Sequence, residues 1–186
     1  MPNRDLRAEI IAKGHEFMAE RENPTFVPGT TYIPPSGKVI EADDLEHLLD
    51  ASLDLWLTAG RYAEQFEKMI SEFMGLKNAR LTVSGSAANL LAFSALTSQK
   101  LNDRRIEAGS EVLTVAAGFP TTVAPIVQNG CIPVFVDVDL TTHNVDVEKL
   151  ASAITPKTRA IMLAHSLGNP FNLRAVSELA SLHNLY

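Results

Sequence analysis

Residues 111–136 read EVLTVAAGFPTTVAPIVQNGCIPVFV, and this stretch decides the fold. Two short runs of mainly apolar and β-branched residues, 111–116 and 132–136, have the composition of buried strands. Residues 120–128 lie between them and have the length of a helix. A strand, a helix and a second strand in this order predict two parallel strands joined by a right-handed crossover.

The same alternation extends in both directions from this stretch. The sequence predicts two further strands, at 80–83 and 159–164, and three further helices, at 87–97, 147–154 and 173–184. Four strands alternating with helices predict an α/β fold with a largely parallel sheet. The helix that follows the first strand is apolar on nearly all sides, so we expect it to be buried.

The N-terminal part of the chain has a different pattern. Three helices are predicted there, at 5–22, from about residue 41, and at 61–74. Residues 58–60 separate the second helix from the third, and Gly75 is placed to end the third. Residues 23–37 are rich in proline and glycine and predict an extended segment, either a linker or an arm laid across a site or a neighbouring subunit. We therefore divide the chain into a helix and arm, 1–40, and an α/β domain, 41–186.

Composition excludes several classes of protein. The chain has 186 residues, 46% of them hydrophobic, and its 22 acidic and 16 basic side chains give a net charge of −6. An acidic excess is unlike a nucleic-acid-binding or anionic-lipid-binding surface. The single cysteine, Cys131, excludes a disulfide framework and a metal site built from cysteines of this chain. No segment approaches the ~20 apolar residues of a membrane span, and the charged start is unlike a secretory signal, so we expect a cytoplasmic protein and assign no metal.

Ligands of open α/β sheets bind beyond the carboxyl ends of the strands, so the turns there are the candidate sites. The turn Ser84-Gly85-Ser86-Ala87 has small residues at the start of a helix. Its backbone N–H groups and the helix dipole can hold a phosphate, and the two serines add hydroxyl donors. The same residues also suit a tight strand-to-helix packing. The turn has neither the Walker A nor the dinucleotide-binding glycine spacing.

The other turns offer weaker candidates. Phe119 is either a core aromatic or a ring that stacks on a planar ligand. Asp137 and Asp139 are typical of residues that cap turns at strand ends. His165 follows a strand, where it is either a hydrogen-bonded structural residue or a functional one. Cys131 lies in an apolar context and reads as a buried, inert thiol.

Taken together, several segments resemble the DegT/DnrJ/EryC family of pyridoxal-phosphate sugar aminotransferases and dehydratases. The matching segments are LTAGR at 57–61, FE at 66–67, SGSAAN at 84–89, PVFVDVD at 133–139, KTRAI at 157–161 and HSLGNP at 165–170. The resemblance covers nearly the whole chain from about Gly29, and the motifs come in the family's order. It implies the N-terminal part of the large domain of the type I pyridoxal-phosphate fold, with helices on both faces of a mainly parallel sheet.

Within the family, one branch looks most similar. Its resemblance rests on YIPPSG at 32–37, TVAAGFPTT at 114–122 and LGNPF at 167–171. This branch is the 3-dehydrase that acts on CDP-4-keto-6-deoxyglucose in the synthesis of the 3,6-dideoxysugars of lipopolysaccharide O-antigen. The resemblance implies pyridoxamine or pyridoxal 5′-phosphate as cofactor, a nucleotide sugar as substrate, a homodimer, and an iron–sulfur flavin reductase as partner.

The resemblance also implies roles for individual residues. The cofactor phosphate would lie on Ser84, Gly85, Ser86 and Ala87, the pyridine ring on Phe119, and His165 and Asn169 near the cofactor. Thr58 and Gly60 would border the substrate side.

Three features of the family are expected beyond Tyr186. These are the acidic partner of the pyridine nitrogen, on a strand that begins at about Tyr186, the active-site base, and the cysteines of a [2Fe–2S] cluster. We therefore expect an N-terminal fragment that is inactive alone. Two alternatives are a pyridoxal-phosphate nucleotide-sugar aminotransferase and an α/β module that binds a phosphorylated ligand without catalysis.

Overall fold

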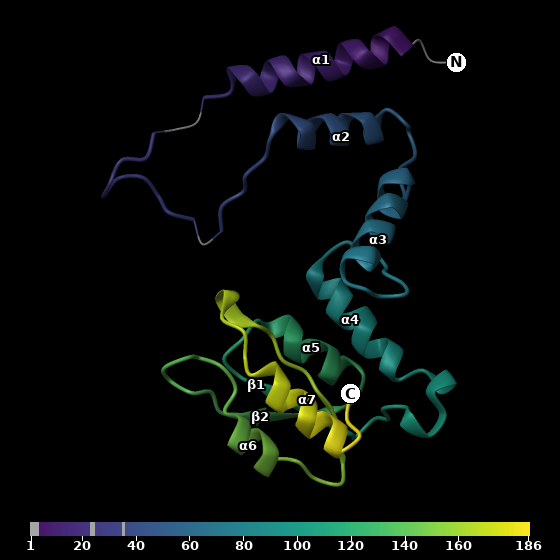
Figure 1. Ribbon diagram of the computed structural model, residues 1–186, viewed down its shortest axis with the longest axis vertical. Helices are drawn as coiled ribbons and strands as arrows, with labels where there is room; N and C mark the ends of the chain where they lie inside the picture. Colours follow the sequence, from purple (N-terminus) through teal and green to yellow (C-terminus); the bar gives the residue numbers. More distant parts are fainter. Residues whose placement is uncertain (1–3, 23–24, 35) are drawn as a thin grey trace. The chain divides into compact units, whose positions relative to one another are not determined.

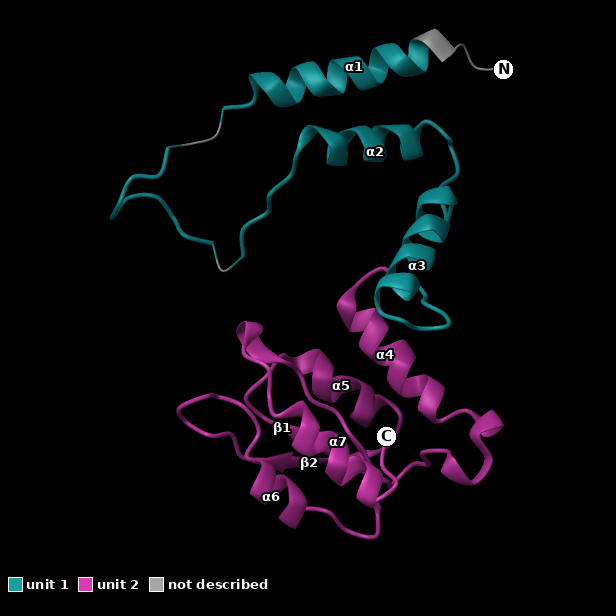
Figure 2. Ribbon diagram, in the orientation of Figure 1, with its two compact units in different colours: residues 1–81 teal, residues 82–186 magenta. Residues whose placement is uncertain are grey.

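The computed structural model describes residues 4–22, 25–34 and 36–186 (Figure 1). The chain forms two compact units, one ending at Leu81 and the other running from Thr82 to Tyr186 (Figure 2). Pro24 and Pro35 of the predicted arm lie outside the described residues. The division of the chain after residue 40 stays a prediction.

The first unit contains the three predicted helices, α1 (Arg4–Glu20), α2 (Ala42–Ser52) and α3 (Arg61–Phe73). Helices α1 and α2 pack closely at Gly14, where an added Cβ would lie 2.6 Å from Cδ1 of Leu49. A larger residue would therefore push the two helices apart. Gly75 follows α3 with a φ of +64°, the left-handed conformation that ends a helix and favours glycine. The predicted stop at Gly75 is confirmed.

The second unit is built on a parallel sheet. Its strands β1 (Glu111–Val115), β2 (Ile132–Val136) and β3 (Thr158–Ile161) lie in the order β2-β1-β3. Four α-helices connect or flank them: α4 (Gly85–Leu96), α5 (Pro120–Gln128), α6 (Val147–Ser152) and α7 (Leu173–Leu182). Two 3₁₀ segments complete the unit, η1 (Gln99–Arg104) and η2 (Ser166–Gly168). The parallel α/β prediction is confirmed.

Helices cover both faces of this sheet, as expected. Consecutive strand residues point to opposite faces. Val112 of β1 packs in a cluster with Phe93 of α4 and Ile126 of α5. Its neighbour Leu113 packs in a second cluster, with Leu150 of α6 and Val176 of α7 among its members.

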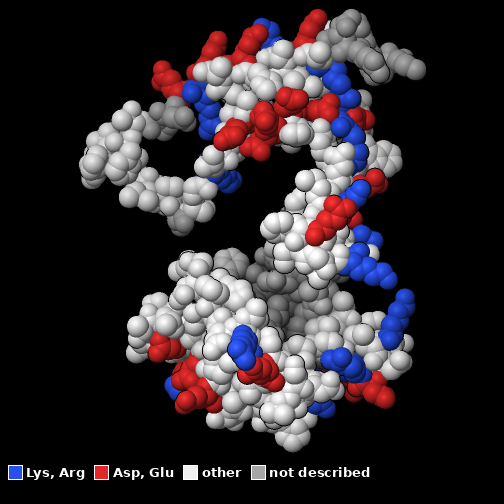
Figure 3. Space-filling model, viewed as in Figure 1, with Lys and Arg blue, Asp and Glu red and all other residues white. Residues whose placement is uncertain are grey.

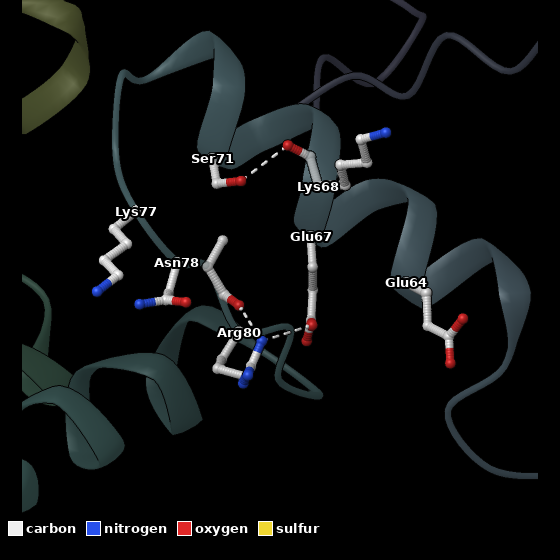
Figure 4. Close-up of a pocket in the computed structure, with 8 residues that line it drawn as sticks. Glu64, Glu67, Lys68, Ser71, Lys77, Asn78 and Arg80 are labelled. Atoms are coloured by element: carbon white, nitrogen blue, oxygen red, sulfur yellow. Dashed lines mark hydrogen bonds and ion pairs between the residues drawn. The ribbon is translucent and has the colours of Figure 1, made fainter.

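The predicted strand at 80–83 is wrong. The backbone N–H of Leu81 donates to Oε1 of Glu67, at 2.9 Å, so a carboxylate of α3 takes the hydrogen bond that a neighbouring strand would need. Arg80 donates from Nη1 to Oε2 of the same glutamate, at 3.0 Å (Figure 4). The segment is therefore held to α3 by side-chain contacts and has no strand partner among the described residues.

One further residue pairs with the free edge of β3. The N–H of Tyr186 donates to the carbonyl of Arg159, at 3.0 Å, and the N–H of Ile161 donates to the carbonyl of Tyr186, at 2.9 Å. These two bonds follow the parallel ladder. The pairing lies where the sequence predicts that the next strand begins.

Helix α4 is less buried than its composition predicts. Phe93 is its one fully buried residue, whereas Leu90 and Leu91 are 39% and 53% exposed. The helix packs along α5, and Leu96 packs against the same core cluster as Phe93, but Leu90 and Leu91 stay exposed among the described residues. The expectation of a helix buried all round is wrong for this structure.

Candidate functional site

The N-terminus of α4 presents free hydrogen-bond donors. Ser84 is the N-cap, and its Oγ accepts from the N–H of Ala87 at 3.1 Å, while its carbonyl accepts from Ala88. The N–H groups of Gly85 and Ser86 have no partner within the described part of the chain. Both residues are exposed. Two N–H groups at the positive end of a helix dipole are therefore available to an anion.

The space beside this turn is open. A Cβ built on Gly85 would meet no atom within 4 Å, so a bound group has room to approach the backbone. The N–H of Ala87, which the resemblance assigns to the phosphate, is already bonded to the hydroxyl of Ser84. The geometry thus places the free backbone donors on Gly85 and Ser86. The turn fits a phosphate group.

Phe119 lies at the corresponding position after β1. It is the N-cap of α5, which Pro120 opens, and its carbonyl accepts from the N–H of Thr122 at 3.0 Å. Its side chain is 70% exposed, so the core interpretation of Phe119 is wrong. An exposed aromatic ring on a fixed helix start can stack on a planar ligand.

Asn89 connects the two turns, and the sequence analysis missed it. Its Nδ2 donates to the carbonyl of Thr121 at 3.3 Å, which joins α4 to the first turn of α5. The phosphate-type turn and Phe119 are therefore held on adjacent helix starts. The available signal was a single amide within the otherwise small and apolar helix 85–96.

His165 and Asn169 hold a second group of loops together. The ring of His165 stacks on Phe171, with centroids 4.1 Å apart and planes at 23°. Asn169 donates from Nδ2 to the carbonyl of Thr142 at 2.9 Å, and Asn144 donates from Nδ2 to the carbonyl of Pro170 at 3.2 Å. The loops after β2 and β3 are thus cross-linked by two amides. In the described residues neither His165 nor Asn169 bonds to the turn 84–87, so their cofactor roles stay predictions.

The two strand-end carboxylates have structural partners. Asp139 accepts from the N–H groups of Thr141 and Thr142, at 3.0 and 2.8 Å, which caps the turn as predicted. These bonds, above all that of Thr142, hold the pKa of Asp139 below its usual range. Asp137 pairs with Nζ of Lys149 at 3.1 Å and raises the pKa of that lysine.

Thr58 and Gly60, the predicted substrate-side residues, belong to the first unit. Nε1 of Trp56 donates to the carbonyl of Ala59 at 2.9 Å, which closes the turn around Thr58. Gly60 is the N-cap of α3, and a Cβ there would lie 3.4 Å from Cδ1 of Trp56. The indole thus fixes the path of this short segment.

Other candidate features carry no site. Cys131 is buried, and burial raises the pKa of its thiol, in agreement with the predicted inert residue. The described residues contain no cluster of His, Cys, Asp or Glu suited to a metal ion. An open pocket of about 230 Å³ beside α3 is polar, but its Arg80 is already paired with Glu67 (Figure 4). No described helix is both long and apolar enough to cross a membrane.

The fold and the candidate site define an α/β protein with the pyridoxal-phosphate aminotransferase fold, as its structural neighbours show. Residues 38–186 match the sequence model of the DegT/DnrJ/EryC1/StrS aminotransferase family. The chain belongs to this family.

Two similar curated proteins align over almost the entire chain. The lipopolysaccharide biosynthesis protein RfbH of Salmonella typhimurium is 51% identical over 100% of this chain and 43% of its own length. The dTDP-4-dehydro-2,6-dideoxy-D-glucose 3-dehydratase of Saccharopolyspora spinosa is 50% identical over 98% of this chain and 39% of its own. The chain therefore spans about two fifths of the length of these relatives.

Solved structures of both reaction types resemble the chain. A GDP-4-keto-6-deoxymannose 3-dehydratase with a trapped PLP–glutamate geminal diamine is 35% identical, with a TM-score of 0.65, over 73% of this chain and 35% of that one. The aminotransferase from Psychrobacter cryohalolentis is 33% identical, with a TM-score of 0.68, over 84% of this chain and 38% of that one.

Proposed function

We propose that this chain is the cofactor-phosphate-binding part of a pyridoxamine- or pyridoxal-phosphate-dependent nucleotide-sugar 3-dehydrase. The substrate we propose is a CDP-4-keto-6-deoxyhexose, deoxygenated at C3 for the 3,6-dideoxysugars of O-antigen. The observation that carries this proposal is the pair of free N–H groups of Gly85 and Ser86 at the N-terminus of α4. Similarity to RfbH and to a sugar 3-dehydratase, at 51% and 50% identity, supports the reaction and the pathway.

The residues of this chain bind and orient. The N–H groups of Gly85 and Ser86, with the hydroxyl of Ser86, would hold the cofactor phosphate. The exposed ring of Phe119 would lie against the cofactor ring. When bound, the cofactor supplies an electron sink that allows the sugar to lose its 3-hydroxyl group. Thr58 and Gly60 would border the nucleotide sugar.

The remaining chemistry is assigned to residues outside this chain. Because the chain spans only 43% and 39% of the two relatives, we expect the active-site base, the acidic partner of the cofactor ring and the [2Fe–2S] cysteines elsewhere in the complete enzyme. The chain alone should bind cofactor weakly and turn over no sugar. We further propose a cytoplasmic homodimer that receives electrons from an iron–sulfur flavin reductase.

A nucleotide-sugar aminotransferase is the second candidate. It is favoured by the structural match to the Psychrobacter aminotransferase and by 30% identity to the GDP-perosamine synthase of Vibrio cholerae. Both candidates use the same phosphate turn. They differ in the fate of the sugar, because one removes the 3-hydroxyl group and the other replaces the keto oxygen by an amine.

Product analysis of the complete enzyme separates the two. Purified enzyme is incubated with CDP-4-keto-6-deoxyglucose, pyridoxamine phosphate and an NADH-dependent iron–sulfur reductase, and in parallel with pyridoxal phosphate and glutamate. The proposal expects a product that has lost the 3-hydroxyl group and forms only with the reductase. An amino sugar formed with glutamate, without loss of the hydroxyl, would refute the dehydrase and support the aminotransferase.

A further inference from the structure

The segment 55–60, which we call the substrate-side loop, is held from both ends by one charged cluster. Two carboxylates near the end of α2, Asp50 and Asp54, precede the loop, and Arg61 follows it directly. Nε of Arg61 bonds Oδ2 of Asp54 at 2.8 Å, and its Nη2 bonds Asp50. Tyr62 donates from its hydroxyl to Oδ2 of Asp50 at 2.7 Å. The chain before the loop is thus tied to the chain after it.

A second guanidinium in this cluster comes from α1. Arg7 bonds Oδ1 of Asp54 through Nη2 at 2.6 Å and lies 3.2 Å from Oδ1 of Asp50 through Nε. Its Nη2 also donates to the backbone carbonyl of Asp50 at 2.7 Å. Charged side chains of both signs gather over α1 and α2 (Figure 3). Two cations therefore share two carboxylates, and each carboxylate is bonded by both arginines.

The helix that supplies Arg7 lies outside the region matched to the family. That match begins at residue 38, after α1 and the extended segment, whereas RfbH aligns with the whole chain. Arg7 lies 47 positions before Asp54, so local chain connectivity does not bring these two residues together. Helix α1 thus adds a contact that the matched region does not provide by itself.

We propose that α1 positions the substrate-side loop and that Arg7 is the residue of α1 that links it to the loop. By holding Asp50 and Asp54, Arg7 fixes the carboxylates that in turn hold Arg61 at the far end of the loop. The order of Thr58 and Gly60 then depends on a helix that does not itself touch them. This inference rests on the proposed function where it concerns substrate, because it takes the loop to border the nucleotide sugar.

The mechanical part is tested by hydrogen exchange in the 186-residue chain. Other contacts keep α1 on α2 when Arg7 is changed, namely Gly14 against Leu49 and His15 Nε2 with Glu46 Oε2 at 2.6 Å. Arg7→Ala should therefore leave the helices folded while amide exchange in peptides covering 53–64 rises at least fivefold. Arg7→Lys replaces the several N–H donors of the guanidinium by a single ammonium group, so exchange in 53–64 should rise less than in Arg7→Ala.

The matched control is Arg174→Ala. Arg174 forms an exposed pair with Glu178 on α7, so its removal should leave exchange in 53–64 unchanged. If Arg7→Ala leaves that exchange at the level of the control, the proposal is overturned. If Arg7→Ala raises exchange throughout the first unit, the Arg7→Lys variant decides. Exchange at the parent's level in the helices but above it in 53–64 supports the positioning role. An equal rise of exchange in the helices and in 53–64 overturns the proposal.

The functional part uses the complete enzyme. Arg7→Ala should raise KM for the nucleotide sugar about fivefold and leave kcat within twofold, because the loop is loosened but the cofactor site is not altered. An unchanged KM with a loosened loop would overturn the substrate role of α1. A parent enzyme that turns over no nucleotide sugar would instead refute the proposed function, and the exchange experiment would still decide the mechanical part.

Discussion

Nδ2 of Asn89 donates a hydrogen bond of 3.3 Å to the carbonyl oxygen of Thr121, and this bond joins the N-terminal half of α4 to the first turn of α5. At the other end of the same helix pair, Nδ2 of Asn129 donates to Oγ of Ser94, also at 3.3 Å. The two helices are therefore clamped at both ends by asparagine amides. Only the first clamp adjoins Gly85, Ser86 and Phe119.

Replacing these asparagines separates stability from site geometry. Asn89→Ala should lower the free energy of unfolding by about 1 kcal/mol, the net contribution of a hydrogen bond. Asn129→Ala should lower it by about 2 kcal/mol, because Nδ2 of Asn129 also donates to the carbonyl of Pro125 at 2.8 Å. Only Asn89→Ala should weaken pyridoxal phosphate binding, on the order of tenfold, because a misplaced phosphate site loses charged hydrogen bonds. Urea denaturation and equilibrium dialysis measure the two effects. Equal losses of affinity in both variants would show that the clamp near Phe119 has no special role.

The proposed phosphate donors can be tested by removing one N–H group. Gly85 is the first residue of α4 and Ser84 before it is extended, so proline fits at position 85 without breaking the helix. Gly85→Pro should therefore keep the fold and raise the dissociation constant for pyridoxal phosphate about tenfold or more, since a bond to a charged group is lost. Leu173→Pro, at the first position of α7, is the control and should bind as the parent does. Unchanged binding by Gly85→Pro would show that the cofactor phosphate does not bind at the N-terminus of α4.

Local pattern was sufficient to predict most of the fold. Helix α5 has the predicted ends, Pro120 and Gln128, because proline opens it and a turn follows. The strand predicted at 80–83 failed for a nonlocal reason. Arg-Leu-Thr-Val has the composition of a strand, but Glu67, fourteen positions before Leu81, takes its N–H group. A strand forms only when its backbone N–H and C=O groups pair with a neighbouring strand. Composition does not show that a side chain, here the carboxylate of Glu67, will take one of those hydrogen bonds instead.

The candidate site was also predictable only in part, because local sequence shows where a helix begins but not which groups compete for its N–H groups. Ser84 to Ala87 could be placed at a helix start from small residues alone, and the structure leaves two donors free there. The assignment of Ala87 as a donor did not allow for the hydroxyl of Ser84, which competes for the same N–H. The bond from Asn89 to Thr121 depends on how α4 packs against α5, and that packing cannot be predicted from the residues of either helix alone.

Acid should weaken the first unit through Asp54. Hydrogen bonds from Arg61 and then Arg7 lower the pKa of this carboxyl from 3.8 to about 2. Because the folded-state pKa lies below the unfolded value, the stabilisation is complete above about pH 4 and is lost as the pH falls towards 2. Asp54→Asn should reduce stability at neutral pH and flatten its fall between pH 4 and pH 2.

Circular dichroism across this pH range, with and without about 1 M salt, measures the effect. Salt should weaken the contribution in the parent, since the cluster is partly exposed. Glu178→Gln, which removes an exposed pair on α7, should leave the acid transition of the first unit unchanged. A parent and an Asp54→Asn variant with the same pH dependence would contradict the assignment.

Two buried threonines should respond in opposite directions to the same substitution. Thr114 of β1 is 0% exposed, and its hydroxyl has no hydrogen-bond partner among the described residues. Thr158 of β3 is 2% exposed, but its Oγ1 accepts from the N–H of Thr155 at 2.9 Å. Valine has nearly the same shape as threonine and lacks the hydroxyl.

Thr114→Val should therefore raise the free energy of unfolding by about 1 kcal/mol, because an unbonded hydroxyl is costly to bury. Thr158→Val should lower it by about 1 kcal/mol, because the N–H of Thr155 loses its acceptor. Urea denaturation of the two variants beside the parent measures both changes. Destabilisation of Thr114→Val by 1 kcal/mol or more would mean that its hydroxyl has a bonding partner, such as a buried water, on the α4 and α5 side of the sheet.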